Sequence, residues 1–165
     1  MPLDLNNLKN FAQRYTVAWC SQNAASVAAF YSPDGSLCIN AGTPAVGRSA
    51  ITNSVQEFMT VFPDLHVHMD DLLVQSAVTA LYLWTLTGTN TGPGGTGHPV
   101  RISGSETWEI NPQGLIAESQ GAFDAADYQH QLTVQSAQEL TPTHGWAPES
   151  KTTASILQKK PPPVV

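Results

Sequence analysis

The chain has 165 residues, a length that suits one domain with a sizeable core. Hydrophobic residues make up 41% of it, which excludes a disordered chain, whereas charged residues make up only 12%, about half of the usual share. The 13 acidic residues outnumber the 7 Lys and Arg. The formal net charge of -6 argues against binding to nucleic acid or to an anionic membrane surface.

The sequence also bears on the location of the protein. No apolar run approaches the length of a membrane-spanning helix, and the N-terminal segment MPLDLNNLKN lacks the apolar stretch of a secretory signal. The two cysteines, Cys20 and Cys38, are too few for a disulfide framework, and we expect both to be small core residues. These features predict a cytoplasmic protein.

The first third of the chain has a helical pattern. Its apolar residues recur at steps of three and four, as along one face of a helix: Leu5, Leu8, Ala12, Tyr15 and Trp19. A second helix is expected over 24–31, with Asn23 as its N-cap, followed by a turn at 33–35 and a short strand over 36–40. A third helix is expected over 48–62, where Pro63 ends it.

The following residues predict a sheet. Segments rich in Val, Leu and Thr, separated by short turns, predict four strands: 65–75, 78–91, 100–110 and 115–123. A short helix over 125–132, with Asp124 as its cap, closes the core. This order predicts an α+β fold in which three N-terminal helices pack on a curved, mostly antiparallel sheet.

The composition changes near residue 133. The remainder reads TVQSAQELTPTHGWAPESKTTASILQKKPPPVV, with few apolar residues, no sustained period and a run of prolines. We therefore expect one domain over residues 1–132 and a low-complexity C-terminal extension over 133–165.

Four segments carry a family resemblance: FPDLHV (62–67), LTGTNTG (86–92), ISGSETWEI (102–110) and GLIAESQGAFDAADYQHQL (114–132). Together they resemble the SnoaL-like polyketide cyclases of the nuclear-transport-factor-two-like (NTF2-like) superfamily. The resemblance covers roughly residues 5–132. It implies a cone-shaped fold whose curved sheet encloses an apolar pocket, and ring closure by an aldol reaction without metal or organic cofactor.

The catalytic positions of these relatives hold different residues here. The acid/base Asp of the cyclases falls on Gly121, and their supporting Gln and His fall on Glu106 and Trp108. In the ketosteroid isomerases of the same superfamily, the oxyanion-hole tyrosine corresponds to Tyr15 and the hydrogen-bond-donating Asp to Glu106. Their catalytic base falls near residues 39–40, where no carboxylate is present. The Asp-Arg-Asp set of the related epoxide hydrolases is also lacking.

Glu106 is the main catalytic candidate. In an extended strand it shares a face with Trp108, and an acid among apolar neighbours is unfavourable to bury unless it is neutral or paired. On the alternative interpretation it faces solvent, with Ser105 and Thr107 inward. If it faces the pocket, burial raises its pKa, and the neutral acid donates to a ligand carbonyl together with the Tyr15 hydroxyl. Tyr15 as an ordinary core tyrosine is the alternative.

Further candidates surround this pair. Asp124 is a third catalytic candidate at the mouth of the pocket, although helix capping alone explains it. The pocket is expected to be lined by Trp19, Asn40, Trp84, Asn90, Trp108 and Ser119. His66, His68 and Asp70 have a spacing that suits a metal, but we expect a surface strand face there, with no metal and no cofactor.

Two classes of function remain open. The first is a cofactor-free lyase, cyclase or isomerase that acts on an apolar cyclic or polyketide-like carbonyl compound through enolate stabilisation. The second is a non-catalytic ligand-binding or dimerisation module with a decayed active site, favoured by the absence of a general base. One expected partner is a small apolar molecule. The other is a second copy of the chain, because two strands are apolar or Thr-rich on both faces and would leave a large exposed patch in a monomer.

Overall fold

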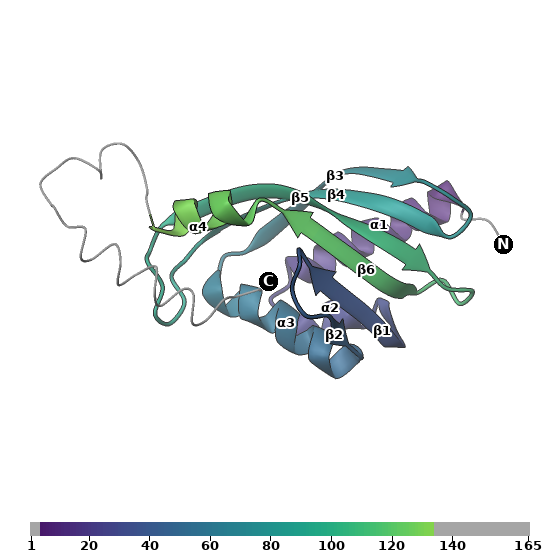
Figure 1. Ribbon diagram of the computed structural model, residues 1–165, viewed down its shortest axis with the longest axis horizontal. Coiled ribbons are helices and arrows are strands. Elements are labelled where there is room, and N and C mark those ends of the chain that lie inside the picture. The colour runs from purple at the N-terminus through teal and green to yellow at the C-terminus, as the bar shows by residue number, and fades with distance from the viewer. Residues whose placement is uncertain (1–3, 134–165) are drawn as a thin grey trace, which may run out of the picture.

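The computed structural model describes residues 4–133, so the expected C-terminal extension lies, apart from Thr133, outside the described residues. Four helices and six strands follow one another along these residues (Figure 1): α1 (Leu5–Trp19), α2 (Ala24–Ala28), β1 (Tyr31–Ile39), β2 (Ala45–Val46), α3 (Arg48–Val61), β3 (His66–Val74), β4 (Thr79–Thr89), β5 (Pro99–Ile110), β6 (Ile116–Phe123) and α4 (Ala125–Thr133). The α+β class is confirmed. Strands β1 and β2, however, lie between the second and third helices.

The helices bury the faces that their periodicity predicts. Helix α1 begins after Asp4, whose carboxylate accepts a hydrogen bond from the backbone N–H of Asn6. Its buried residues are Leu8, Phe11, Ala12, Tyr15, Ala18 and Trp19, whereas Leu5 is largely exposed. Helix α2 ends at Ala28, earlier than expected, because Tyr31 already pairs with Ile116 of β6.

All six strands form one curved sheet in the order β2-β1-β6-β5-β4-β3. Neighbouring strands are antiparallel except for β1 and β6, which are parallel. The turn expected at 33–35 is wrong, since these residues belong to β1. The register against β6 shifts between Tyr31 and Ser36, so the Pro-Asp-Gly segment forms an irregularity within the strand.

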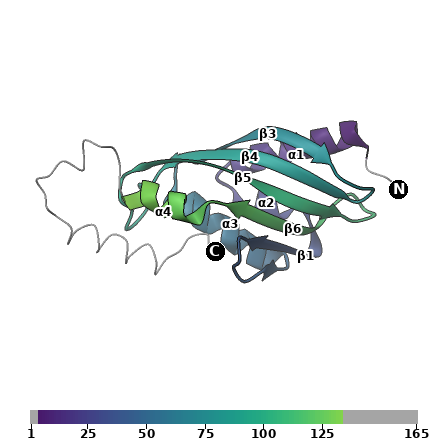
Figure 2. The same cartoon turned by 45° about the horizontal axis from the view of Figure 1, so that its top comes forward.

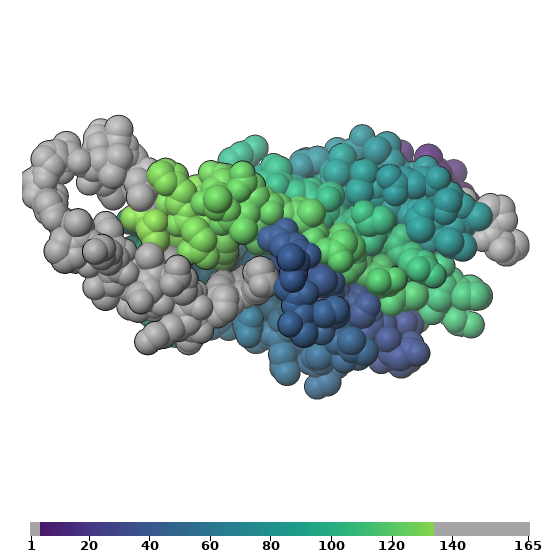
Figure 3. Space-filling view, viewed as in Figure 1, coloured from purple at the N-terminus to yellow at the C-terminus, as the bar shows by residue number. Residues whose placement is uncertain are grey.

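Helices α1, α2 and α3 lie together on one side of the sheet, as Figures 1 and 2 show. Helix α1 contacts β3, and α3 contacts β1. Helix α4 lies at the end of the sheet where β6 ends. In the space-filling view its light-green surface lies next to the dark-blue surface of the β1–β2 region (Figure 3). Among residues 4–133, no helix is long and apolar enough to cross a membrane.

The strand register arranges the helix-facing side chains of β4, β5 and β6 in rows across the sheet. Three successive rows are Ala80–Trp108–Ser119, Tyr82–Glu106–Gly121 and Trp84–Gly104–Phe123. Successive rows are about 6.8 Å apart along the strands. The middle row places the candidate acid in the centre of the sheet, beneath α1.

Candidate functional site

Glu106 faces the helices, which confirms the inward interpretation of its strand. Its neighbours on the same face, Ile102 and Trp108, are buried, and Glu106 itself is only 7% exposed. The intervening Ser103 and Thr107 are exposed. An acidic side chain is therefore held among apolar residues in the middle of the core.

Three side chains donate hydrogen bonds to one oxygen of this carboxyl group. The Tyr15 hydroxyl lies 2.9 Å from Oε1, the Trp108 Nε1 2.7 Å and the Ser119 Oγ 3.2 Å. No hydrogen bond to Oε2 is found among residues 4–133. The two oxygens thus differ: Oε1 accepts three hydrogen bonds, and Oε2 accepts none from the described residues.

The Tyr15 hydroxyl is fully engaged by this arrangement. It also lies 2.9 Å from the hydroxyl of Tyr31. Because a tyrosine has a single hydroxyl hydrogen, which Tyr15 donates to Glu106, Tyr31 is the donor in the second bond. Tyr15 therefore orients the carboxyl group and has no hydrogen left for a ligand. The expectation that Tyr15 and Glu106 both donate to a ligand carbonyl is wrong for Tyr15 in this arrangement.

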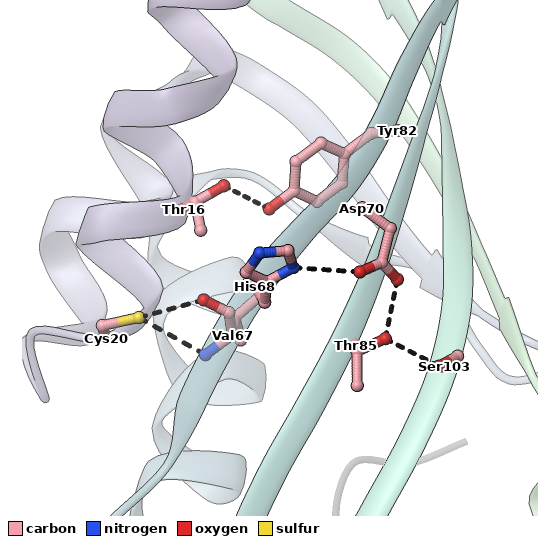
Figure 4. Close-up of polar contacts among 8 residues, drawn as sticks. All are labelled: Thr16, Cys20, Val67, His68, Asp70, Tyr82, Thr85 and Ser103. Carbon is pink, nitrogen blue, oxygen red and sulfur yellow. Dashed lines mark hydrogen bonds and ion pairs between the residues drawn. The ribbon is translucent and has the colours of Figure 1, made fainter.

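Aromatic rings support these donors. Trp108 stacks on Tyr82 with ring centroids 4.8 Å apart, and Tyr15 meets both rings edge-on at 5.0 and 5.5 Å. The Tyr82 hydroxyl lies 2.6 Å from Thr16 Oγ1 (Figure 4). One turn of α1 thus contacts the sheet through two neighbouring residues, Tyr15 and Thr16, each with its own partner on the sheet.

Burial dominates the electrostatics of this cluster. Loss of water raises the pKa of Glu106, while the hydrogen bonds from Trp108, Tyr15 and Ser119 act in the opposite direction. Burial also raises the pKa of Tyr15 and of Tyr31 well above the usual range, and the nearby Glu106 charge adds to both shifts. Both phenols therefore stay protonated and act as hydrogen-bond donors.

A small cavity lies against Glu106. Its lining residues are Trp19, Leu37, Ile39, Phe58, Val67, Tyr82, Trp84, Leu86, Glu106 and Phe123. The volume is about 40 Å³, room for roughly three water molecules. Among the described residues that line it, Glu106 is the one carboxyl group, which makes it the candidate for proton exchange with a ligand. A ligand with more than a few heavy atoms has to displace side chains.

Four of the six expected pocket residues lie either in the cavity lining or against Glu106. Trp19 and Trp84 line it directly. Trp108 and Ser119 are fully buried, and they contact Glu106 rather than the cavity. The structure therefore brings four expected residues and both members of the expected Glu106 and Tyr15 pair into one site.

Asn40 lies at the edge of this site. It follows the lining residue Ile39 and has a left-handed φ of 53°. Its Oδ1 accepts a hydrogen bond of 2.9 Å from the backbone N–H of Phe123, another lining residue. Asn40 therefore ties the end of β1 to the end of β6.

The structure places two expected residues away from the cavity. Asn90 is buried in the connection between β4 and β5, where its backbone bonds to Gly97 and His98. Asp124 is exposed, and its Oδ1 accepts the backbone N–H of Asp127 at 3.0 Å, as a cap of α4 does.

Sequence analysis missed several residues of the site. Tyr82 and Trp84 lie two residues apart in β4. Because residues two apart in a strand share a face, the expected position of Trp84 in the pocket also predicts that Tyr82 faces it. Tyr31 is the last residue of the helix expected over 24–31, and this position does not predict the contact of its hydroxyl with that of Tyr15. Phe123 had no distinguishing pattern, because its neighbourhood depends on the pairing of β5 with β6.

The opposite face of the sheet carries a separate polar chain (Figure 4). His68 Nδ1 lies 3.0 Å from Asp70, Thr85 Oγ1 donates to Asp70 at 2.6 Å, and Thr85 lies 2.7 Å from Ser103. The bond from Thr85 lowers the pKa of Asp70. The His68 side chain is 70% exposed, as a surface strand face predicts. Within residues 4–133 no group of three potential metal ligands is found.

Comparison with known proteins gives the family. The sequence model of the SnoaL-like polyketide cyclases matches residues 9–132, so the chain belongs to this family. No curated protein matches it. A putative SnoaL-like polyketide cyclase from Jannaschia has a TM-score of 0.62 at 13% identity, covering 77% of this chain and 94% of that one.

Two further solved structures are similar in fold. A hypothetical protein with a ketosteroid isomerase-like fold from Catenulispora acidiphila, in complex with trimethylamine, has a TM-score of 0.66 at 15% identity, covering 74% of this chain and 91% of that one. An epoxide hydrolase/cyclase-like enzyme with a role in pyran ring formation in the polyether salinomycin has a TM-score of 0.65 at 14% identity, with coverages of 75% and 95%. At these identities the similarity establishes the NTF2-like fold alone.

Proposed function

We propose that the protein is a cofactor-free isomerase, lyase or cyclase that acts on a small apolar carbonyl compound, cyclic or polyketide-like, through its enolate. One observation carries the proposal. Glu106 is buried against an apolar cavity with Oε1 held by three donors, while no described residue bonds to Oε2. A carboxyl group that presents one oxygen to a cavity is arranged for proton exchange with a ligand.

The reaction requires Glu106 in both of its protonation states. As the carboxylate, Oε2 takes the proton from a carbon beside the carbonyl group, and the electron pair of the C–H bond moves into the enolate. As the neutral acid, Glu106 returns that proton. It goes to another carbon in an isomerisation, or to the alkoxide formed when the enolate carbon attacks a second carbonyl in a cyclisation. A raised pKa suits this exchange near neutral pH.

Proton exchange on a simple ketone tests the proposal without knowledge of the substrate. In D2O the wild-type protein should exchange the α-protons of 1-tetralone, measured by NMR. Glu106→Gln should reduce this exchange about 10²–10⁴-fold, because the positioned acid/base is lost. Glu109→Gln is the matched control, since Glu109 is exposed on the opposite face of the same strand. Equal exchange by wild type and Glu106→Gln would refute the proposal.

A binding protein without turnover is the second candidate. The cavity lining is almost entirely apolar, and the acid/base positions of relatives hold Gly121 and Asn40. This function predicts that the wild-type protein binds 1-tetralone but leaves its α-protons unexchanged. The same NMR samples therefore separate the two candidates.

We also propose that two copies pair through the sheet face that α1, α2 and α3 leave open. Leu73 and Leu81 pair across β3 and β4 on this face, and Leu73 is 45% exposed. A second copy would cover these residues together with the polar chain from His68 to Ser103. Light scattering should give the dimer mass at micromolar concentration, and Leu81→Glu should give the monomer. A wild-type monomer at this concentration would exclude the pairing.

A further inference from the structure

Three buried polar atoms without a hydrogen-bond partner among residues 4–133 belong to residues that contact Phe123. They are Asn40 Nδ2, Trp84 Nε1 and the Tyr128 hydroxyl. The Phe123 ring lies 6.1 Å from that of Trp84 and 5.4 Å from that of Tyr128, centroid to centroid. Its backbone N–H donates to Asn40. Two of these residues contact the Phe123 ring and one contacts its backbone, so all three are neighbours of the same residue.

Such groups are unfavourable to the fold, and folded proteins contain few of them. A buried donor that has lost its water and gained no partner lowers the stability of the fold by the full free-energy cost of that desolvation. Tyr128 shows this most clearly, because it is only 3% exposed and burial alone raises its pKa. Exceptions of this kind are concentrated at functional or strained sites, so their position beside a cavity makes this cluster a candidate ligand site.

The chemistry of the cluster restricts what it binds. The Trp84 indole nitrogen is a donor only. Asn40 must turn its oxygen toward the N–H of Phe123, so its other atom, Nδ2, is also a donor. The Tyr128 hydroxyl donates or accepts. Each of the three therefore fits an acceptor oxygen, such as that of a carbonyl group or of the enolate formed from it.

The cluster is continuous with the cavity beside Glu106. Trp84 and Phe123 both line that cavity. They lie in the row of side chains next to that of Glu106, about 6.8 Å along the sheet. A ligand the size of one or two fused rings spans this distance.

Trp84 and Phe123 are the two cavity-lining rings of this cluster, and Phe123 is the one placed to move. The Trp84 ring lies directly on the backbone of Gly104, where a Cβ atom would come within 2.6 Å of it. Phe123 is the last residue of β6 and is only partly buried. Rotation of its side chain would join the cavity to the Tyr128 hydroxyl.

We propose that Phe123 covers a second, hydrogen-bonding subsite of the cavity, in which Trp84, Tyr128 and Asn40 bind an acceptor oxygen of the ligand once the Phe123 ring swings aside. This inference rests on the proposed function, since it assumes a carbonyl compound beside Glu106. It supplies the hydrogen-bond donors that the enolate oxygen needs and that Tyr15 does not provide.

Removal of one hydroxyl group tests the subsite. Tyr128→Phe should leave the melting temperature of the ligand-free protein unchanged or raise it, because an unpartnered hydroxyl is removed from the core. The same change should weaken binding of 1-tetralone about three- to tenfold, the loss of one ordinary hydrogen bond. Binding of tetralin, which has the same rings without the carbonyl oxygen, should not change.

Two further variants complete the design. Tyr82→Phe is the matched stability control, because the Tyr82 hydroxyl has a partner in Thr16 and its removal should lower the melting temperature. Phe123→Leu keeps an apolar residue but opens the subsite, so it should tighten binding of 1-tetralone more than binding of tetralin. Calorimetry of both ligands with each variant gives the comparison.

Several results would overturn the subsite. A melting temperature of Tyr128→Phe that falls as in Tyr82→Phe would show a structural partner for the hydroxyl. Equal effects on 1-tetralone and tetralin, no effect on either, or no binding of either ligand to wild type and Phe123→Leu would also overturn it. Failure of the proposed function is recognised separately, by unchanged α-proton exchange in Glu106→Gln with the Tyr128→Phe results intact.

Discussion

The hydrogen bond from Tyr15 to Glu106 gives the sharpest test of the site. Tyr15→Phe keeps the ring that packs on Trp108 and Tyr82, but removes the donor 2.9 Å from Oε1 and the acceptor of the Tyr31 hydroxyl. The site then loses a donor that favours the carboxylate. We therefore expect the pKa of Glu106, already raised by burial, to rise further.

The magnitude follows from the bonds lost. A hydrogen bond to a charged group contributes about 1.5–3 kcal/mol, and a bond between neutral groups about 0.5–1.5 kcal/mol. Tyr15→Phe should therefore lower the free energy of unfolding by about 2–4.5 kcal/mol when Glu106 is ionised, and by less when it is neutral. Urea unfolding at several pH values measures this difference.

The assay for the carboxyl group itself is an NMR titration with carbon-13-labelled glutamate, in parallel with the pH profile of α-proton exchange on 1-tetralone. Both midpoints should move to higher pH in Tyr15→Phe. Thr16→Val is the matched control, because it removes a neighbouring hydroxyl that bonds to Tyr82 and not to Glu106. A Glu106 pKa that stays constant or falls in Tyr15→Phe would refute the proposed role of Tyr15.

Three other predictions concern Glu106, Gly104 and Gly121, which lie in two neighbouring rows of the sheet. Because the folded state raises the pKa of Glu106, it binds this proton more tightly than the unfolded state does. The resulting stabilisation is complete below the unfolded pKa and is lost as the pH rises through the folded pKa, so Glu106→Gln should flatten this part of the pH–stability curve measured by urea unfolding. Gly104→Ala should destabilise the protein by about 1–3 kcal/mol in thermal or urea unfolding, since its Cβ would lie 2.3 Å from the Ala122 carbonyl oxygen and 2.6 Å from Trp84. Gly121→Ala, whose Cβ would meet its neighbours at 3.6 Å or more, should change stability by no more than about 0.5 kcal/mol, and a loss equal to that of Gly104→Ala would contradict this account.

The sequence by itself determined the features that depend on local periodicity. The stripe on α1 predicted which side of the helix is buried, and the alternation along β5 placed Glu106 on one face with Trp108 without deciding which face is inward. Both follow from the geometry of a single element, in which side chains recur every 3.6 or every two residues. The family resemblance added the fold, because the order of its motifs spans roughly residues 5–132. The match of the family model to residues 9–132 confirms this resemblance.

Only the tertiary structure decided which side chains meet. The segment at 33–35 has turn-forming residues, yet pairing with β6 draws it into a strand. Tyr15 was expected to face a ligand, but the position of α1 over the sheet directs its hydroxyl to Glu106. The cluster around Phe123 joins residues from β1, β4, β6 and α4. Such contacts depend on strand register and on helix placement, which residues distant in the chain determine jointly and no local pattern records.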